Sequence, residues 1–168
     1  MNEKDLKRII AQSLGKESIS ESYVTTSKKY ELSTELLSEK AKEAHQKLFK
    51  DYSEKLNTIS ARLDVASRED ANSNYSEFRS LKMDETHNIN GGFLHALYFD
   101  NISDPNSIIM LDSLTYLRIE RDFGTFDDWQ KDFIASAMAS RGGWAMMVYS
   151  IPLHRYINVV VDGHTTGI

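Results

Sequence analysis

The chain has 168 residues, with 20 lysines and arginines against 25 aspartates and glutamates, and so a net charge of −5. This length suits one domain or two small domains packed together, and the 40% hydrophobic content excludes wholesale disorder. The absence of cysteine excludes disulfides, thiolate metal sites and a cysteine nucleophile. An acidic balance without a basic stripe disfavours nucleic acid as a partner. No apolar run reaches the roughly 20 residues of a membrane-spanning helix, and the N-terminus lacks the features of a secretory signal, so we expect a cytoplasmic protein.

Residues 1–32 are predicted to form a short helix and a linker arm. The stretch from Asp5 to Leu14 has an amphipathic pattern that Gly15 ends. The segment that follows is polar and rich in serine and threonine, which is typical of a linker.

Residues 33–102 are predicted to form two long antiparallel helices. Apolar residues recur every three or four positions over about seven turns, without glycine or proline, at Leu37, Ala41, Ala44, Leu48, Tyr52, Leu56, Ile59 and Leu63. Ser67 followed by Asp70 resembles a capping box and predicts the start of the second helix. The residues expected on one face of that helix are Tyr75, Phe78, Leu81, Glu85, Ile89, Phe93 and Leu97. A short polar link makes such helices pack as a hairpin. Gly91-Gly92 favours close contact between the helices; the alternative is room left beside a site.

Residues 103–168 are predicted to form an incomplete α/β unit of two helices and two strands. The helices are expected at Ser107 to Arg121, and from a cap at Thr125 and Asp128 to about Ser140. The strands are expected at Trp144–Tyr149 and Leu153–Asp162, as a β-hairpin. A lone two-stranded hairpin is marginal in water, and an open apolar edge invites pairing with another strand. The fold class is therefore mainly α with a small antiparallel sheet (α+β).

Five histidines are the candidate chemical groups. His45 and His95 each lie among apolar residues of one predicted helix, and each alone is more often a core histidine than a ligand. Together they fit a pair of antiparallel helices that each send one imidazole into the shared interior, as in bundle metal sites. Two nitrogens do not fill a coordination sphere, and no HExxH or Glu-x-x-His repeat indicates a metalloprotease or di-iron bundle. His87 has polar neighbours and is predicted to be solvated, His154 receives no role, and the sequence alone favours an exposed loop position for His164.

Four blocks, in order, resemble the iron/manganese superoxide dismutase family. They are His45 to Tyr52 with Leu56-Asn57, Leu94 to Phe99, Phe123 to Phe133 followed by Arg141-Gly142-Gly143-Trp144, and Asp162-Gly163-His164. The resemblance covers roughly residues 35–168. It implies the fold of that family and a single iron or manganese ion, with His45 and His95 as metal ligands. It also implies that Tyr52 and His164 are the catalytic residues that hydrogen-bond to metal-bound solvent and set proton delivery, and that Trp129 and Trp144 wall the pocket.

One departure from the family leaves alternatives open. The family takes two further ligands, an aspartate and a histidine, from a later D-x-W/Y-E-H segment, and this sequence has no counterpart of it. We expect the larger subunit of a split superoxide dismutase, which converts superoxide to dioxygen and hydrogen peroxide once a second chain supplies those ligands and a third strand. Such a complex is a homo- or hetero-oligomer. The alternatives are a catalytically inactive, dismutase-like binding or assembly protein, and a truncated chain. We favour the split enzyme because His45, His95, Tyr52 and His164 are all retained.

Overall fold

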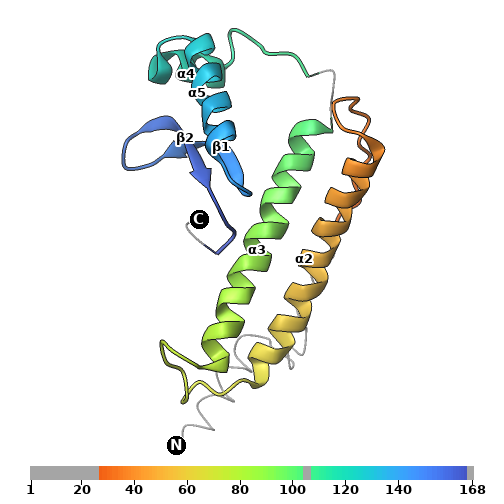
Figure 1. Cartoon of the computed structure of the whole chain (residues 1–168). Coiled ribbons are helices and arrows are strands. Elements are labelled where there is room, and N and C mark those ends of the chain that lie inside the picture. The colour runs from red at the N-terminus through yellow and green to blue at the C-terminus, as the bar shows by residue number, and fades with distance from the viewer. Residues whose placement is uncertain (1–26, 104–106, 166–168) are drawn as a thin grey trace, which may run out of the picture.

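The computed structural model describes residues 27–103 and 107–165, so the helix expected between Asp5 and Leu14 lies outside the described residues. Its helices and strands are α2 (Glu39–Val65), α3 (Glu77–Ile102), α4 (Leu114–Phe123), α5 (Phe126–Ala139), β1 (Trp144–Ser150) and β2 (Arg155–Val161). Figure 1 shows a long helical hairpin, then two shorter helices and a small sheet. This architecture confirms the predicted fold class.

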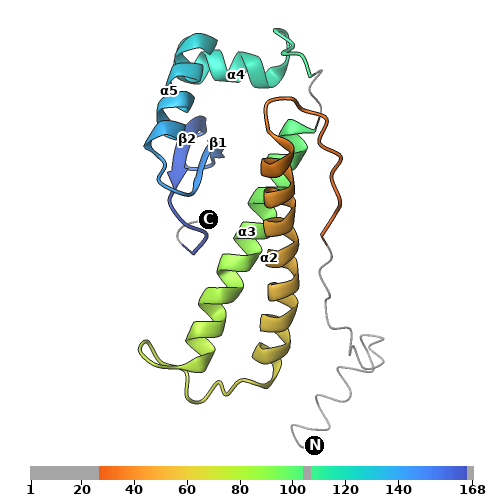
Figure 2. The same ribbon diagram turned by 45° about the vertical axis from the view of Figure 1, so that its right-hand side comes forward.

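The helical hairpin consists of α2 and α3, which lie antiparallel and side by side in both views (Figures 1 and 2). Ser38 caps α2 by accepting a hydrogen bond from the Ala41 N–H at 3.2 Å. The predicted start of the second helix is wrong. Ser67 does accept the Asp70 N–H at 3.4 Å, but this bond closes only a turn. The helix begins after Ser76, whose hydroxyl accepts the Arg79 N–H at 3.0 Å.

The apolar face predicted for the second helix is also wrong in its later half. Leu81 is buried, but Ile89, Phe93 and Leu97 are between 42% and 55% exposed. A strict spacing of four residues drifts by about 40° per step around a helix with 3.6 residues per turn. The series therefore turns away from α2 as it approaches Leu97. The residues that α3 buries are Leu81, Asn88, Gly91, Leu94, His95 and Phe99.

The second unit comprises α4, α5 and the β1–β2 hairpin, which runs antiparallel from the pair Trp144–Val161 to the pair Ser150–Arg155. Helix α4 is shorter than predicted, because the Ser113 hydroxyl caps it by accepting the Tyr116 N–H at 3.2 Å. The predicted cap of α5 is confirmed: the Thr125 hydroxyl accepts the Asp128 N–H at 3.0 Å. Both helices pack on the sheet, which lies beside α3 on the side away from α2 (Figure 2).

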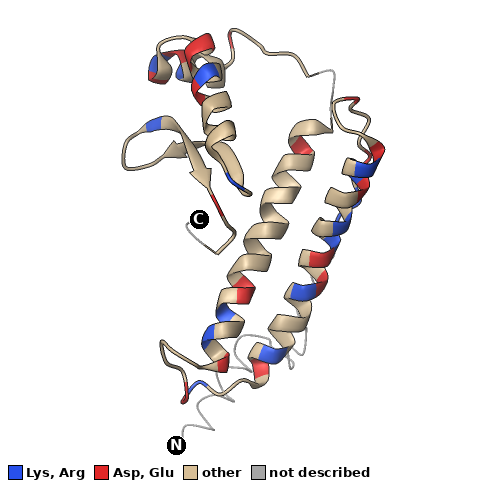
Figure 3. Ribbon diagram, in the orientation of Figure 1, with Lys and Arg blue, Asp and Glu red and all other residues tan. Residues whose placement is uncertain are grey.

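The two units differ in how much they bury. The hairpin holds two apolar clusters, one of Ile59, Leu63, Ala66 and Leu81, the other of Tyr30, Phe49 and Phe99. Helix α5 buries no residue. Charged residues are spread along α2 and lie at the ends of α3, whereas residues 86–99 of α3 include no lysine, arginine, aspartate or glutamate (Figure 3). Within the described ranges, no helix combines the length and the apolar character needed to cross a bilayer.

Candidate metal centre

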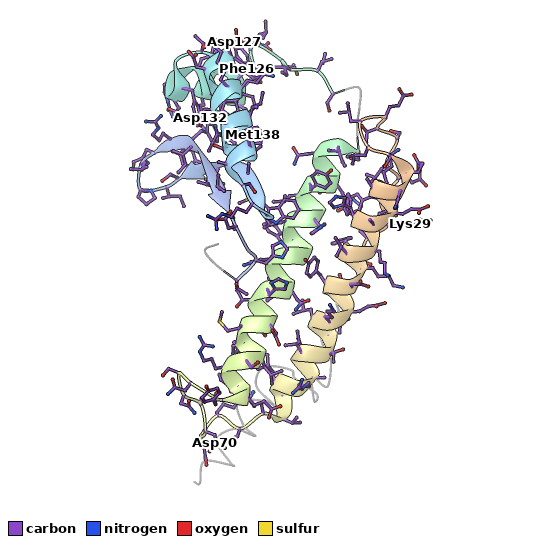
Figure 4. The ribbon with its side chains drawn as sticks, in the orientation of Figure 1. Lys29, Asp70, Phe126, Asp127, Asp132 and Met138 are labelled. Carbon is purple, nitrogen blue, oxygen red and sulfur yellow. The ribbon has the colours of Figure 1, made fainter. Side chains whose placement is uncertain are left out.

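The structure brings His45 of α2 and His95 of α3 together between the two helices. Their ring centroids are 5.9 Å apart and their planes meet at 44°. Two imidazoles that bind one metal through bonds of about 2.1 Å have centroids about 5 to 6 Å apart, so this spacing suits a shared cation. Figure 4 shows side chains of both helices filling the space in which they meet.

His95 is held as a neutral imidazole with one free nitrogen. Its Nδ1 lies 2.7 Å from the carbonyl oxygen of Gly91, and because a carbonyl only accepts, Nδ1 carries the proton and donates it. Nε2 then keeps its lone pair for a metal. The ring is only 4% exposed, and burial lowers the pKa of His95 against the opposing effect of that hydrogen bond. A neutral ring is the form that ligates metals.

His45 carries the observation that tests whether these residues fit an iron or manganese ion. Its Nδ1 is buried and has no hydrogen-bond partner among the described residues. A buried polar atom without a hydrogen-bond partner lowers the stability of the fold by about 1–3 kcal/mol. A cation coordinated by the imidazole nitrogen would remove that cost. Imidazole nitrogen is also a donor that suits iron. The residues present therefore fit the group.

Tyr52 of α2 lies against this pair, and Gly91 makes its position possible. The Tyr52 ring centroid is 5.3 Å from that of His95. A Cβ atom at Gly91 would lie 2.8 Å from two carbons of the Tyr52 ring, whereas a Cβ at Gly92 would meet nothing within 4 Å. Gly91 thus permits the close contact between the helices that the sequence favoured, and the side chain that it meets is the candidate site residue Tyr52. Burial raises the pKa of the Tyr52 phenol, which keeps it protonated at neutral pH.

His164 is brought to the same centre from the loop after β2. Its ring centroid lies 5.2 Å from that of Tyr52, and its Nε2 accepts a 2.7 Å hydrogen bond from Nε1 of Trp144. The Asn90 amide donates to the His164 carbonyl at 2.7 Å, which fixes the loop to α3. His164 is half-buried, so the exposed position that the sequence favoured is wrong. Burial lowers its pKa, and the neighbouring His87 and His95 lower it further.

His87 was missed as a member of this cluster, because its polar neighbours predicted only a solvated residue. It is half-buried, with ring centroids 5.7 Å from Tyr52 and 5.0 Å from His164. The sequence does hold a signal for it, since residues 87, 91 and 95 follow one another at a helical spacing of four. His154, by contrast, is exposed in the β1–β2 turn and far from the cluster in the fold.

The remaining candidates have structural partners. Asp162 is exposed, and one of its carboxylate oxygens accepts the Arg141 N–H at 3.3 Å. The Trp144 ring packs edge-on against His95 at 4.9 Å and so walls the centre as predicted. Trp129 instead stacks between Phe126 and Phe133 on α5. Within residues 27–103 and 107–165, no three or more histidine, cysteine, aspartate or glutamate side chains form a group that could hold a metal.

Comparison with known proteins identifies relatives, although no family model matches the chain. The chain is 38% identical to the iron superoxide dismutase of Aquifex pyrophilus over 125 residues, which are 73% of this chain and 56% of that protein. It is 37% identical to the iron superoxide dismutase of Aquifex aeolicus, with the same coverage. It is 42% identical to the manganese superoxide dismutase of Haloarcula hispanica over 82 residues, which are 49% of this chain and 56% of that protein. The chain thus spans about half the length of these relatives. By these similarities and the arrangement of its histidines, the chain belongs to the iron/manganese superoxide dismutase family.

Proposed function

We propose that this chain is the larger part of an iron/manganese superoxide dismutase whose metal centre is completed by a second chain. The reaction converts two superoxide anions and two protons to dioxygen and hydrogen peroxide. The second chain contributes an aspartate and a histidine ligand and a third strand of the sheet.

The observation that carries this proposal is the meeting of two imidazoles between α2 and α3, of which His95 is 4% exposed and His45 has a buried Nδ1. The Nδ1 of His95 is occupied by the Gly91 carbonyl, which leaves Nε2 free, and His45 has a buried Nδ1 without a partner among the described residues. The ring centroids of the two histidines are 5.9 Å apart. Tyr52 and His164 flank them, and Trp144 closes one side. A protein that only bound a partner would not need this arrangement.

The chain's own residues hold protons beside the ion and exclude water from it. The bound iron or manganese would supply the one-electron change of oxidation state that the reaction needs. The Tyr52 hydroxyl is kept protonated because burial raises its pKa, and the Tyr52 ring packs against His95. Trp144 fixes the tautomer of His164, because Nε2 accepts the indole N–H and the proton of the neutral ring therefore sits on Nδ1. Tyr52 and His164 thus each carry a proton beside the centre.

An apolar surface of the second unit is the feature that favours binding of a second chain. A cleft of about 650 Å³ runs between α3 and the second unit, lined by Leu94, Leu97, Trp129, Phe133, Trp144 and Met146, among others. On α5, which contributes Trp129 and Phe133 to this cleft, Ile134 is 54% and Met138 is 82% exposed. Contiguous exposed apolar surface marks interaction sites. We propose that the segment that carries the missing ligands packs here.

The test is metal binding and turnover with a complement. The chain is co-expressed with the C-terminal part of the Aquifex pyrophilus enzyme that lies beyond the matched region, and the complex is analysed for iron, manganese and superoxide consumption. We expect about one metal ion per complex and measurable dismutation, and little of either for the chain alone. His95→Ala removes one ligand and should abolish metal binding and turnover.

The control separates the two candidate functions. A binding or assembly protein would form the same complex without stoichiometric metal, and His95→Ala would leave the complex and its composition unchanged. Full turnover by the chain without any complement would overturn the need for a second chain. A complex that forms but binds neither iron nor manganese would overturn the proposal that the chain is part of an enzyme.

A further inference from the structure

An apolar surface on α4, and on the segment that leads into it, is exposed in the part of the chain that the structure describes. Six large apolar side chains form this surface, each between 52% and 84% exposed, and we name it the 108–117 surface: Ile108, Ile109, Met110, Leu111, Leu114 and Leu117. The Ser113 N–H donates to the Met110 carbonyl at 3.0 Å, and this turn brings the first four residues directly before α4. Contiguous exposed apolar side chains of this kind mark interaction sites.

The 108–117 surface is not the face through which α4 packs in its own unit. Leu114 and Leu117 are three residues apart and share one face of the helix, whereas the buried Ile119 lies about 140° to 200° away from them around it. The neighbours of α4 in the described chain are α5 and β2. The surface is also separate from the cleft lined by Trp144 and Met146, where we place the second chain.

The same polypeptide carries an apolar stripe near its N-terminus. Between Asp5 and Leu14, apolar residues recur at the three- and four-residue spacing of one helix face, at Leu6, Ile9, Ile10 and Leu14. This stretch lies outside the described residues. Helices shorter than about 12–15 residues are marginal in water on their own, and most helical stability comes from packing an apolar face on another surface. A helix over these residues therefore requires an apolar surface of matching size.

The place at which the described chain begins favours the 108–117 surface as that partner. Residues 27–38 run beside α2 on the side away from the sheet, and the segment before α4 lies at the end of the hairpin where α2 begins (Figure 2). Leu14 stands 16 residues before Tyr30 and reaches up to about 53 Å from it when the chain is extended. Tyr30 packs on Phe99 with ring centroids 5.0 Å apart, and Ile108 follows Phe99 by nine residues, which span at most about 32 Å. The linker is thus long enough to bring the two surfaces together.

We propose that residues 5–14 pack as an amphipathic helix on the 108–117 surface of the same chain. Tethering favours this occupant over a second copy of the chain, because a segment on a short flexible linker is present at an effective concentration near the millimolar range. The inference goes beyond the proposed function and does not depend on it, since neither surface belongs to the metal centre. The N-terminal helix covers the apolar side of α4 and leaves the cleft open to the second chain.

The test is a spin-label measurement on the full chain, which has no cysteine of its own. Arg8→Cys carries the label on the polar side of the stretch, because residue 8 lies about 200° around a helix from both Leu6 and Ile10. In the isotope-enriched protein, the label should broaden the NMR signals of the backbone amides of residues 108–117. It should leave the loop between α2 and α3 at the far end of the hairpin sharp.

Two substitutions, one on each surface, should remove this broadening. Ile10→Asp puts a charge in the apolar stripe, and Leu117→Asp puts one in the surface on α4. Gln12→Asp is the matched control, because residue 12 lies on the polar side, about 200° around a helix from Ile10, and it should leave the broadening unchanged. Circular dichroism of each variant checks that the helical hairpin is intact.

The other outcomes overturn the proposal. Broadening that appears only when labelled, unenriched chain is mixed with enriched, unlabelled chain would show that the surface joins two copies. Broadening of residues 144–148 in place of residues 108–117 would show that the N-terminal segment occupies the cleft. Sharp signals throughout, or broadening that survives both Ile10→Asp and Leu117→Asp, would show that the apolar stripe does not pack on α4. None of these results bears on metal binding or turnover, so the proposed function stands or falls separately.

Discussion

The helical hairpin and the second unit differ in how many apolar side chains they bury. The hairpin buries Phe99 completely and Leu81 to 2% exposure, within clusters that draw on both helices and on the segment around Tyr30. In the second unit, only Ile119 and Val161 are buried apolar residues among those described. The hairpin carries its own core, whereas the second unit has apolar side chains that nothing in the described chain covers.

The candidate centre lies where these two units meet, and they contribute differently to it. The hairpin positions His45, His95 and Tyr52 on two packed helices, with His95 fixed by the Gly91 carbonyl. The second unit adds Trp144 and His164 through side-chain contacts and a hydrogen bond from Asn90 to the His164 carbonyl. His45, His95 and Tyr52 are thus held by the packed hairpin, while Trp144 and His164 depend on a unit that buries few apolar side chains.

The largest contrast is expected from truncating one apolar side chain in each unit. Phe99→Ala removes a fully buried ring from the Tyr30–Phe49 cluster and should lower the free energy of unfolding by about 3–5 kcal/mol. Met138→Ala, near the end of α5 (Figure 4), removes a side chain that is 82% exposed and should change it by no more than about 0.5 kcal/mol. Urea unfolding followed by circular dichroism measures both. Equal costs would mean that α5 has a core of its own.

A smaller effect is expected from two adjacent glycines inside α3. Gly91→Ala forces the Tyr52 ring to move, since the new methyl would meet it at 2.8 Å, and overpacking of this kind costs about 1–3 kcal/mol. Gly92→Ala meets open space and should stabilise the helix by up to about 1 kcal/mol. Thermal unfolding of the two variants gives opposite shifts if Gly91 is the contact point. Shifts of the same sign would show that Tyr52 does not pack there.

The difference between local sequence and packing between elements explains which features the sequence could predict. The prediction of the hairpin rests on helical periodicity, and the prediction of the Thr125 cap rests on a contact between residues close in sequence. Both predictions were correct because they depend on local sequence alone. The start of α3 was misplaced because Ser67 and Ser76 both accept a backbone N–H three residues on, and only the packing of α3 against α2 selects Ser76. Local pattern offers no way to choose between two such serines.

The site shows the same limit. His45 and His95 could be found because each shares a helix face with apolar residues. His87 has polar neighbours, and the contacts that bring it into the cluster come from Tyr52 and His164, which lie far from it along the chain. The position of His164 depends on Asn90 and Trp144, which belong to different units. Side chains that meet only across a tertiary junction leave no periodic signal.

The smallest effect concerns a charged anchor that joins α4 to the sheet. The Asp122 carboxylate accepts hydrogen bonds from Nε and Nη2 of Arg121 at 2.6 and 2.9 Å and from the Tyr156 N–H at 2.7 Å. The Arg121 bonds, with the Tyr156 N–H, lower its pKa from 3.8 to about 2. Since the pKa is lower in the folded state, this group stabilises the fold above about pH 4, and the contribution is lost as the pH falls toward 2.

Asp122→Asn should therefore lower the urea midpoint at pH 6 and match the native chain near pH 2. Trp129 and Trp144, the only two tryptophans, both lie in the second unit, so their fluorescence reports on it selectively. Glu77→Gln is the control in the hairpin, because the Arg62–Glu77 pair is 60% and 64% exposed at its side chains and should add little at any pH. If Asp122→Asn lowers the urea midpoint by the same amount from pH 6 to pH 2, the lost interaction does not depend on the carboxylate charge. A deficit that fades with acid would show that the second unit, poor in buried apolar contacts, depends on this charged anchor to hold β2 against α4.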